Sequence, residues 1–197
     1  MLTKLFLKCL HAEYTHMDGV SYAFLREGAS LTVLFEDSNG KLDWQRNLDF
    51  AVNESDGALV HRGFLEAFSL VEDLIAEAIK SPSLRRLTVA GYSHGGALAV
   101  LCHAYAYSVR PDLRAHLQTV TYGAPRVYKS SPSDSEARFS RLLRVENIGD
   151  IVTDLPPELF GFSHVGTRLA IGRQGAYGPF RAHMAESYLK ELEAYAF

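Results

Sequence analysis

The stretch Gly91-Tyr-Ser-His-Gly95 constrains this chain most, because it places a serine between two glycines. The β-branched run at 87–90 predicts a strand before it, and small apolar residues predict a helix after it. A serine on so sharp a turn has strained backbone angles, and side chains two positions away would clash. Gly96 lets the helix pack closely. The stretch predicts a nucleophile elbow, with Ser93 exposed and the His94 amide at a helix N-terminus, where it stabilises an oxyanion.

Length and composition are typical of a globular chain and limit what it binds. The 197 residues are 47% hydrophobic and 22% charged, which predicts one domain over 1–197. A net charge of −3 gives no electrostatic reason to bind nucleic acid or an anionic membrane. The apolar run at 1–10 is interrupted by Lys8 and lacks a following cleavage site, so it predicts an N-terminal helix rather than a signal peptide. Since no segment is long enough to span a bilayer, we expect a cytoplasmic chain.

The cysteines and histidines indicate neither a disulfide framework nor a metal site. Of the two cysteines, Cys9 and Cys102, the second lies in the apolar segment after the elbow and is predicted to be a small core residue. Among the eight histidines, His11 and His16 form the one close cluster with acidic residues, at a spacing that fits no ligand pattern. We therefore predict no metal and no cofactor.

The alternation of β-prone and helical segments predicts the fold. Runs at 20–25 and 30–35 flank a glycine-bearing turn and predict a hairpin, while apolar residues at helical spacing over 63–80 predict one helix. Further strands are expected at 117–122, 142–147 and 167–171, loops at 53–57 and 129–140, and helices at 94–109 and 182–195. This order predicts an α/β fold with a mostly parallel central sheet, helices on both faces and an antiparallel edge hairpin. The site should lie at the carboxyl ends of the strands.

A serine nucleophile needs a base, and the base needs a buried carboxylate. Histidine titrates in the range required to take the serine proton, and the carboxylate fixes its tautomer and stabilises its cation. Asp150 follows the strand at 142–147 and is favoured as the acid, with Asp154 as the alternative. His183 follows the last strand and is favoured as the base, with His164 as the alternative. The order serine, acid, histidine is typical of α/β-hydrolases.

Several blocks, in the same order, resemble the class 3 lipases, a family of fungal triacylglycerol lipases with plant and bacterial relatives. The resemblance runs from about position 31 to position 188. Its blocks are Thr32–Ser38 with Asp43 and Trp44, Val60–Phe64, Gly91–Ala99, Tyr122–Val127, Asp150–Pro157 and Phe160–Gly166. The resemblance implies an α/β-hydrolase fold, a lipid or other acyl-ester substrate and transient contact with a lipid interface. It does not predict the oligomeric state.

Carried over position by position, the resemblance assigns the catalytic roles. It makes Ser93 the nucleophile, Asp150 the acid and His183 the base. It favours His183 over His164, because the histidine of the Phe160–Gly166 block is not catalytic in the family. It assigns no metal or cofactor.

The resemblance also assigns the oxyanion hole and a lid, and here the sequence departs from the family. The oxyanion donors are the His94 amide and Ser38, and the segment after Ser38, with Trp44, corresponds to the lid; Trp44 as a core anchor is equally compatible. Glu36-Asp37 stands where the family has Arg-Gly. Aspartate tolerates unusual backbone angles better than most residues. Because inward carboxylates would oppose developing negative charge, we expect this pair to face solvent.

The sequence thus predicts a serine carboxylester hydrolase of lipase type. It would cleave acyl esters, such as acylglycerols or related lipids, through an acyl-enzyme on Ser93. Two alternatives remain open. The altered turn at Glu36-Asp37 favours a catalytically impaired lipase-like binding module, and the same machinery would serve a phospholipase A1 or a short-chain esterase.

Overall fold

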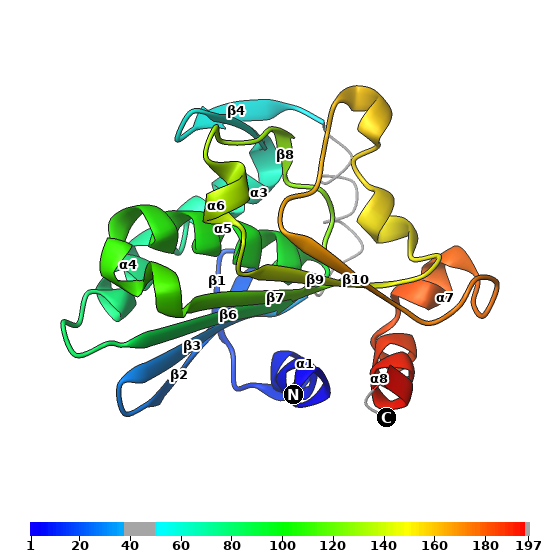
Figure 1. Ribbon diagram of the computed structural model, residues 1–197, viewed down its shortest axis with the longest axis horizontal. Helices are drawn as coiled ribbons and strands as arrows, with labels where there is room; N and C mark the ends of the chain where they lie inside the picture. Colours follow the sequence, from blue (N-terminus) through cyan, green and yellow to red (C-terminus); the bar gives the residue numbers. More distant parts are fainter. Residues whose placement is uncertain (38–49, 196–197) are drawn as a thin grey trace.

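A central sheet organises the protein. The computed structural model describes residues 1–37 and 50–195. Within them, a seven-stranded sheet has the order β1-β2-β3-β6-β7-β9-β10 (Figure 1). Its strands are β1 (Thr15–Met17), β2 (Val20–Glu27), β3 (Ser30–Phe35), β6 (Arg86–Tyr92), β7 (Leu117–Tyr122), β9 (Leu142–Asn147) and β10 (Thr167–Ile171). β3, β6, β7, β9 and β10 run parallel, and the β1–β2 and β2–β3 pairs are antiparallel. The predicted sheet with its edge hairpin is confirmed.

Helices cover both faces of this sheet, as predicted (Figure 1). One face carries α3 (Arg62–Ser69), α4 (Glu72–Ile79) and α5 (His94–Val109), and the other carries α1 (Leu2–His11) and α8 (Ala185–Tyr195). Shorter elements are η1 (Pro111–His116), α6 (Ser135–Arg138), η2 (Ile151–Asp154), η3 (Glu158–Phe160) and α7 (Pro179–His183). Each face has its own core of buried apolar side chains. Cys102 belongs to the first of these and is 0% exposed, which confirms its predicted role.

Two helices that the sequence predicts as continuous are each interrupted. The segment 63–80 forms α3 and α4, and the Ser69 hydroxyl at the end of α3 donates to the Leu65 carbonyl at 2.8 Å. Such a bond competes with the helical backbone and bends helices. The segment 182–195 is divided between α7 and α8, because Met184 has extended angles of φ −62° and ψ 142°. His183 therefore ends a short helix of its own.

A second, smaller sheet lies on the same side of the central sheet as α5 (Figure 1). It is antiparallel and consists of β4 (Val52–Ser55), β5 (Ala58–His61) and β8 (Tyr128–Ser130). The prediction of a loop at 53–57 was wrong, because Asp56 and Gly57 form the tight turn between β4 and β5, with φ values of 50° and 71°. Positive φ at both central positions defines a type I′ hairpin turn, for which Asp-Gly is a preferred sequence.

Candidate active site

The serine at position 93 lies on a strained turn between β6 and α5. Ser93 has φ 55° and ψ −123°, and α5 begins at the next residue, His94. A Cβ atom added at Gly91 would lie 2.1 Å from the carbonyl oxygen of Gly95, and one at Gly95 would lie 2.4 Å from that of Glu36. Real side chains do not make contacts this short. The glycines are therefore required because the turn packs backbone against backbone, which is the elbow geometry predicted from the sequence.

Three predicted site residues meet at the carboxyl ends of the central strands. Ser93 follows β6, Asp150 follows β9, and His183 ends α7. Oγ of Ser93 lies 2.8 Å from Nε2 of His183, and Nδ1 of His183 lies 2.9 Å from Oδ2 of Asp150. All three residues are buried. They form a continuous hydrogen-bonded chain from carboxylate to hydroxyl, in which an imidazole is placed to remove the serine proton.

Further hydrogen bonds hold the carboxylate of Asp150. Its Oδ1 accepts from the Val152 amide at 2.9 Å, and its Oδ2 accepts from the Tyr188 hydroxyl at 2.7 Å. The same hydroxyl accepts from the Asn147 amide at 3.0 Å. Burial, followed by the charge of Asp150, raises the pKa of Tyr188 well above its ordinary value, so this hydroxyl remains a donor. Asp150 is therefore fixed in orientation and kept as a hydrogen-bond acceptor.

Hydrogen bonds and ring stacking hold the backbone and the ring of His183 in place. The Tyr92 hydroxyl donates to the carbonyl of His183, and the two rings stack at 5.3 Å with an interplanar angle of 22°. Nδ2 of Asn147 donates to the carbonyl of the preceding residue, Ala182, at 2.9 Å. A Cβ added at Gly123 would lie 3.1 Å from Cε1 of His183, so the backbone of Gly123 closes one side of the imidazole.

The N-terminal helix supports the same site from beneath the sheet. Phe6 of α1 is 0% exposed, and its ring centroid lies 5.5 Å from that of Tyr92, 4.7 Å from that of Tyr122 and 5.9 Å from that of Tyr188. Aromatic pairs at these distances are mutually stabilising. The two tyrosines that bond Asp150 and His183 thus pack on α1, which connects this helix to the candidate site.

The alternative acid and base lie elsewhere. The Asp154 carboxylate pairs with Arg126 at 3.4 Å, and its side chain is 74% exposed. Nε2 of His164 lies 2.8 Å from the Thr153 carbonyl oxygen, and burial lowers the pKa of His164 to about 4. These contacts give both residues structural roles in the segment after the acid.

One of the two predicted oxyanion-hole residues, His94, lies within the described part of the chain. His94 occupies the first position of α5, so its amide lies at the positive end of the helix, beside Ser93. The other predicted donor, Ser38, and the lid candidate, Trp44, lie outside the described residues. Gly95 brings the backbone of β3 and the following residue against the start of α5. The turn after β3 therefore begins next to the elbow.

Glu36 and Asp37 begin that turn. The sequence predicts that both carboxylates face solvent, and both residues are intermediate in exposure. Burial raises the pKa of Tyr92, and the charge of Asp37 is the next contribution to this increase. The charge of Asp37 therefore acts on the Tyr92 hydroxyl, which donates to the carbonyl of His183.

Three residues that hold the site were not predicted from the sequence: Tyr92, Asn147 and Tyr188. Tyr92 occupies a variable position of the Gly-x-Ser-x-Gly motif. Its place next to the serine could have indicated a role in the site. Asn147 ends the strand before the acid, and a polar residue there was a weaker signal. Tyr188 reaches Asp150 because the chain turns at Met184, and no sequence pattern indicates that turn.

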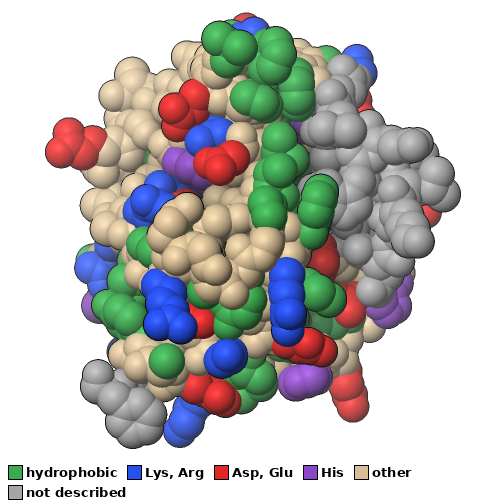
Figure 2. Space-filling model, turned by 90° about the vertical axis from the view of Figure 1, so that its right-hand side faces the viewer, with side chains coloured by type: hydrophobic (Ala, Val, Ile, Leu, Met, Phe, Trp, Pro, Cys, Tyr) green, Lys and Arg blue, Asp and Glu red, His purple; other side chains and the backbone are tan. Residues whose placement is uncertain are grey.

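Large hydrophobic side chains are exposed near the carboxyl ends of the strands. Leu159 and Phe160 of η3 are 90% and 49% exposed, and Phe180 of α7 is 76% exposed. Figure 2 shows the face on which α7 lies, where hydrophobic side chains form a band. Across the described ranges, no cluster of three or more metal-binding side chains is found. Nor does the described part of the chain contain a helix long and apolar enough to cross a membrane.

Comparison with known proteins gives this geometry a family. The sequence model of the class 3 lipase family matches residues 32–160 of this chain. The lipase of Rhizomucor miehei is 32% identical over 148 residues, covering 70% of this chain and 40% of that protein. The lipase of Rhizopus niveus is 33% identical over 131 residues, covering 60% of this chain and 33% of that protein. The chain belongs to the class 3 lipase family, and it spans 40% or less of the length of these two curated relatives.

Solved structures agree with this assignment. The Rhizomucor miehei lipase propeptide complex superposes with a TM-score of 0.69 at 29% identity, covering 82% of this chain and 56% of that one. A triacylglycerol lipase whose catalytic centre is described as a serine protease triad has a TM-score of 0.66 at 28% identity, with coverages of 78% and 62%. The α/β-hydrolase fold predicted from the sequence is confirmed.

Proposed function

We propose that this protein is a serine carboxylester hydrolase of lipase type. The observation that carries the proposal is the hydrogen-bonded chain from Asp150 through His183 to Ser93, set on a strained elbow. Buried acid, base and hydroxyl at 2.8 and 2.9 Å are spaced for nucleophilic acyl transfer. Membership of the class 3 lipases supports the same reaction.

The proposed reaction uses these groups in sequence. Nε2 of His183 takes the proton of Ser93 while Oγ attacks the ester carbonyl carbon, and Asp150 stabilises the imidazolium that forms. The oxyanion is stabilised by the amide of His94 at the positive end of α5, and by Ser38 as the second proposed donor. His183 then protonates the leaving alcohol, and water attacks the acyl-enzyme by the same route. No metal or cofactor takes part.

We propose an acyl ester with an apolar acyl chain, such as an acylglycerol or a related lipid, as the substrate. The exposed side chains of Leu159, Phe160 and Phe180 support this proposal, because they present apolar surface at the end of the sheet that carries Ser93. Such a surface favours transient contact with a lipid interface. Similarity to lipases of Rhizomucor and Rhizopus species supports the same class of substrate.

The test is hydrolysis of p-nitrophenyl esters of increasing chain length by the protein and by Ser93→Ala. The variant should lose at least about 10³-fold in kcat/KM, because loss of any triad member removes most of the rate enhancement. Ser83→Ala, which changes an exposed serine away from the site, is the matched control and should retain full activity. Circular dichroism should show the same fold in all three. Undiminished hydrolysis by Ser93→Ala would rule the proposal out.

The negative charge of Asp37 favours a second candidate, a lipase-like binding module with an impaired site. Such a module would bind lipid vesicles but hydrolyse none of the esters at any chain length. A phospholipase A1 or a short-chain esterase would keep the mechanism and differ in substrate. A phospholipid added to the ester series separates these cases, since each predicts a different member as the best substrate.

A further inference from the structure

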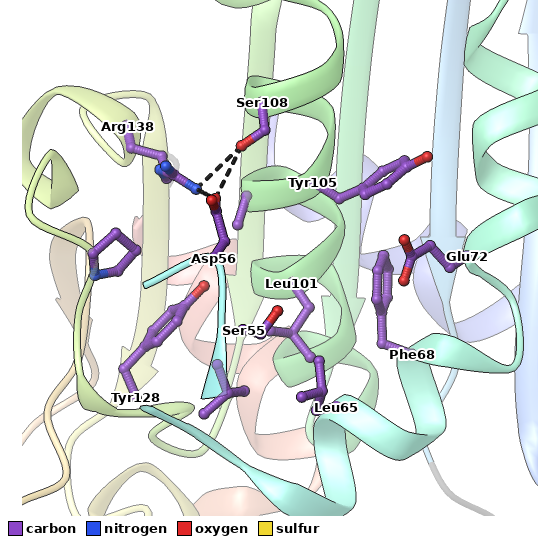
Figure 3. Close-up of a pocket in the computed structure, with 13 residues that line it drawn as sticks. Ser55, Asp56, Leu65, Phe68, Glu72, Leu101, Tyr105, Ser108, Tyr128 and Arg138 are labelled. Carbon is purple, nitrogen blue, oxygen red and sulfur yellow. Dashed lines mark hydrogen bonds and ion pairs between the residues drawn. The ribbon is translucent and has the colours of Figure 1, made fainter. Parts of the chain in front are cut away.

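A cavity lies along the C-terminal half of α5, away from the proposed catalytic residues. It has a volume of about 220 Å³ and lies between α3, α5 and the small sheet (Figure 3). Leu101 is the lining residue of α5 nearest in sequence to Ser93, and at 1.5 Å per residue it lies about 12 Å further along the helix. Ser93, His183 and Asp150 do not line it. The cavity is therefore a separate feature of the fold.

Apolar side chains form much of the cavity wall. Leu65 and Phe68 project from α3, and Leu101 projects from α5 (Figure 3). Ala104 of α5 also lines the cavity. A cavity of about 150 Å³ with such a lining accommodates benzene. In proportion, 220 Å³ has room for a ligand of about nine non-hydrogen atoms. This wall fits a short hydrocarbon chain.

One buried tyrosine directs its hydroxyl into this cavity, on the side of Asp56 (Figure 3). Tyr128 of β8 is 2% exposed, its ring packs on Phe139 at 5.7 Å, and its hydroxyl points into the cavity (Figure 3). No other described residue forms a hydrogen bond with that hydroxyl. Burial raises the pKa of Tyr128, so the phenol is protonated and can donate. The hydroxyl oxygen is not one of the fully buried polar atoms that lack a partner, so it is open to the cavity, from which a ligand can supply its partner.

The charges around the cavity select against an anion. Arg138 is the cation of the lining, and its guanidinium is paired with Asp56 and with Asp134, the latter at 2.9 Å. Ser108 completes this group through a 3.2 Å hydrogen bond to Asp56. Glu72 adds a further carboxylate to the lining. The carboxylates outnumber the one cation, so a bound carboxylate would meet repulsion without a free partner.

We propose that this cavity binds a neutral amphiphile with one oxygen acceptor and a short apolar chain, of the class of medium-chain alcohols. The oxygen would accept a hydrogen bond from the Tyr128 hydroxyl, and the chain would contact Leu65, Phe68 and Leu101. This binding requires no hydrolysis and does not depend on the proposed function.

The first test measures binding of octan-1-ol, octanoate and octylammonium by calorimetry and by saturation-transfer NMR at pH 8. Octan-1-ol should bind saturably with one site, and octanoate should bind at least tenfold more weakly. Tyr128→Phe keeps the buried ring and removes its hydroxyl, so it should weaken octan-1-ol binding about tenfold. Tyr177→Phe, which removes a tyrosine hydroxyl outside the cavity, is the matched control and should not change binding.

The second test fills the cavity and varies the ligand. Ala104→Leu adds three carbon atoms to the α5 wall and should abolish binding, with its fold checked by circular dichroism. For the unmodified protein, affinity in a series of straight-chain alcohols should peak near eight carbons, because the cavity has a fixed length. This series applies even if the filled variant fails to fold. Affinity that rises with every added carbon, or that is equal in Tyr128→Phe and the unmodified protein, would overturn the proposal.

Discussion

The two sides of Ser93 differ in how they are built. On the acid–base side, the Tyr188 hydroxyl and the Val152 amide hold Asp150, and the Tyr92 hydroxyl holds the His183 carbonyl. On the oxyanion side, the turn after β3 begins with Glu36 and Asp37, both intermediate in exposure, where the family resemblance leads us to expect Arg-Gly. In the proposed reaction, the contacts on the acid–base side preorganise proton transfer, whereas the oxyanion would form beside a turn that begins with two acidic residues. We therefore expect the oxyanion side to limit the rate.

The largest expected effect comes from breaking the acid–base side at Asp150. Asp150→Asn should lower kcat about 10⁴-fold, because the amide cannot stabilise the imidazolium and favours the wrong tautomer of His183. Asp154→Asn changes an exposed carboxylate a few residues away and should leave kcat unchanged. A loss of similar size in both variants would show that Asp150 has no special role.

A smaller loss is expected where a residue positions the acid. Tyr188→Phe removes the donor to Oδ2 of Asp150 and keeps the ring, so kcat should fall about tenfold while KM stays constant. Tyr177→Phe is again the control, because its hydroxyl bonds Glu191 at 2.8 Å, away from the site. A change in KM alone would assign Tyr188 to substrate binding and contradict its positioning role.

The oxyanion side should respond in the opposite direction. Asp37→Asn removes the charge that acts on Tyr92, so kcat should rise about threefold to tenfold, which corresponds to roughly 1 kcal/mol of relieved repulsion. Asp73→Asn removes an equal charge from α4 and should have no effect. A fall in kcat for Asp37→Asn would show that this carboxylate supports the turn and would reverse our account of this side.

The smallest effect on catalysis is expected from a buried histidine far along α5. Burial lowers the pKa of His103 to about 4, against about 6.5 in an unfolded chain. Between these values the unfolded chain binds more protons than the folded one. His103 therefore contributes stability above pH 6.5 that is lost as the pH falls towards 4, on the order of 3 kcal/mol.

His103→Gln should therefore weaken the pH dependence of the unfolding free energy between pH 6.5 and 4, measured by urea denaturation. Its kcat at pH 8 should be unchanged, since His103 bonds Thr119 and the Arg138 carbonyl rather than a site residue. An unchanged pH dependence would mean that His103 does not remain neutral in the folded protein.

Features governed by local sterics could be predicted from the sequence. The elbow depends on the absence of Cβ atoms at Gly91 and Gly95, and a five-residue motif records that requirement. The parallel strands could also be predicted, because short apolar runs alternate along the chain with segments of helical periodicity. Their order then places Ser93, Asp150 and His183 at one edge of the sheet.

Features that depend on distant contacts could not be predicted in this way. Apolar periodicity continues across residues 70–71, and the hydrogen bond from Ser69 to Leu65 lies at the end of α3, just before that break. The role of Tyr188 depends on the turn at Met184. The Asp56-Gly57 turn is a different case, because Asp-Gly is a local signal for a hairpin turn and was interpreted as part of a loop.

The most direct test of the account is the reactivity of Ser93 towards a fluorophosphonate, followed by intact-protein mass and peptide mapping. We predict stoichiometric modification of Ser93 in the protein, loss of labelling in His183→Gln, and full labelling in His116→Gln, which changes a histidine away from the site. The prediction follows because the hydroxyl reacts when the imidazole takes its proton. An unlabelled Ser93 in the folded protein, or equal labelling of His183→Gln, would contradict the claim that this side of the site is built for proton transfer.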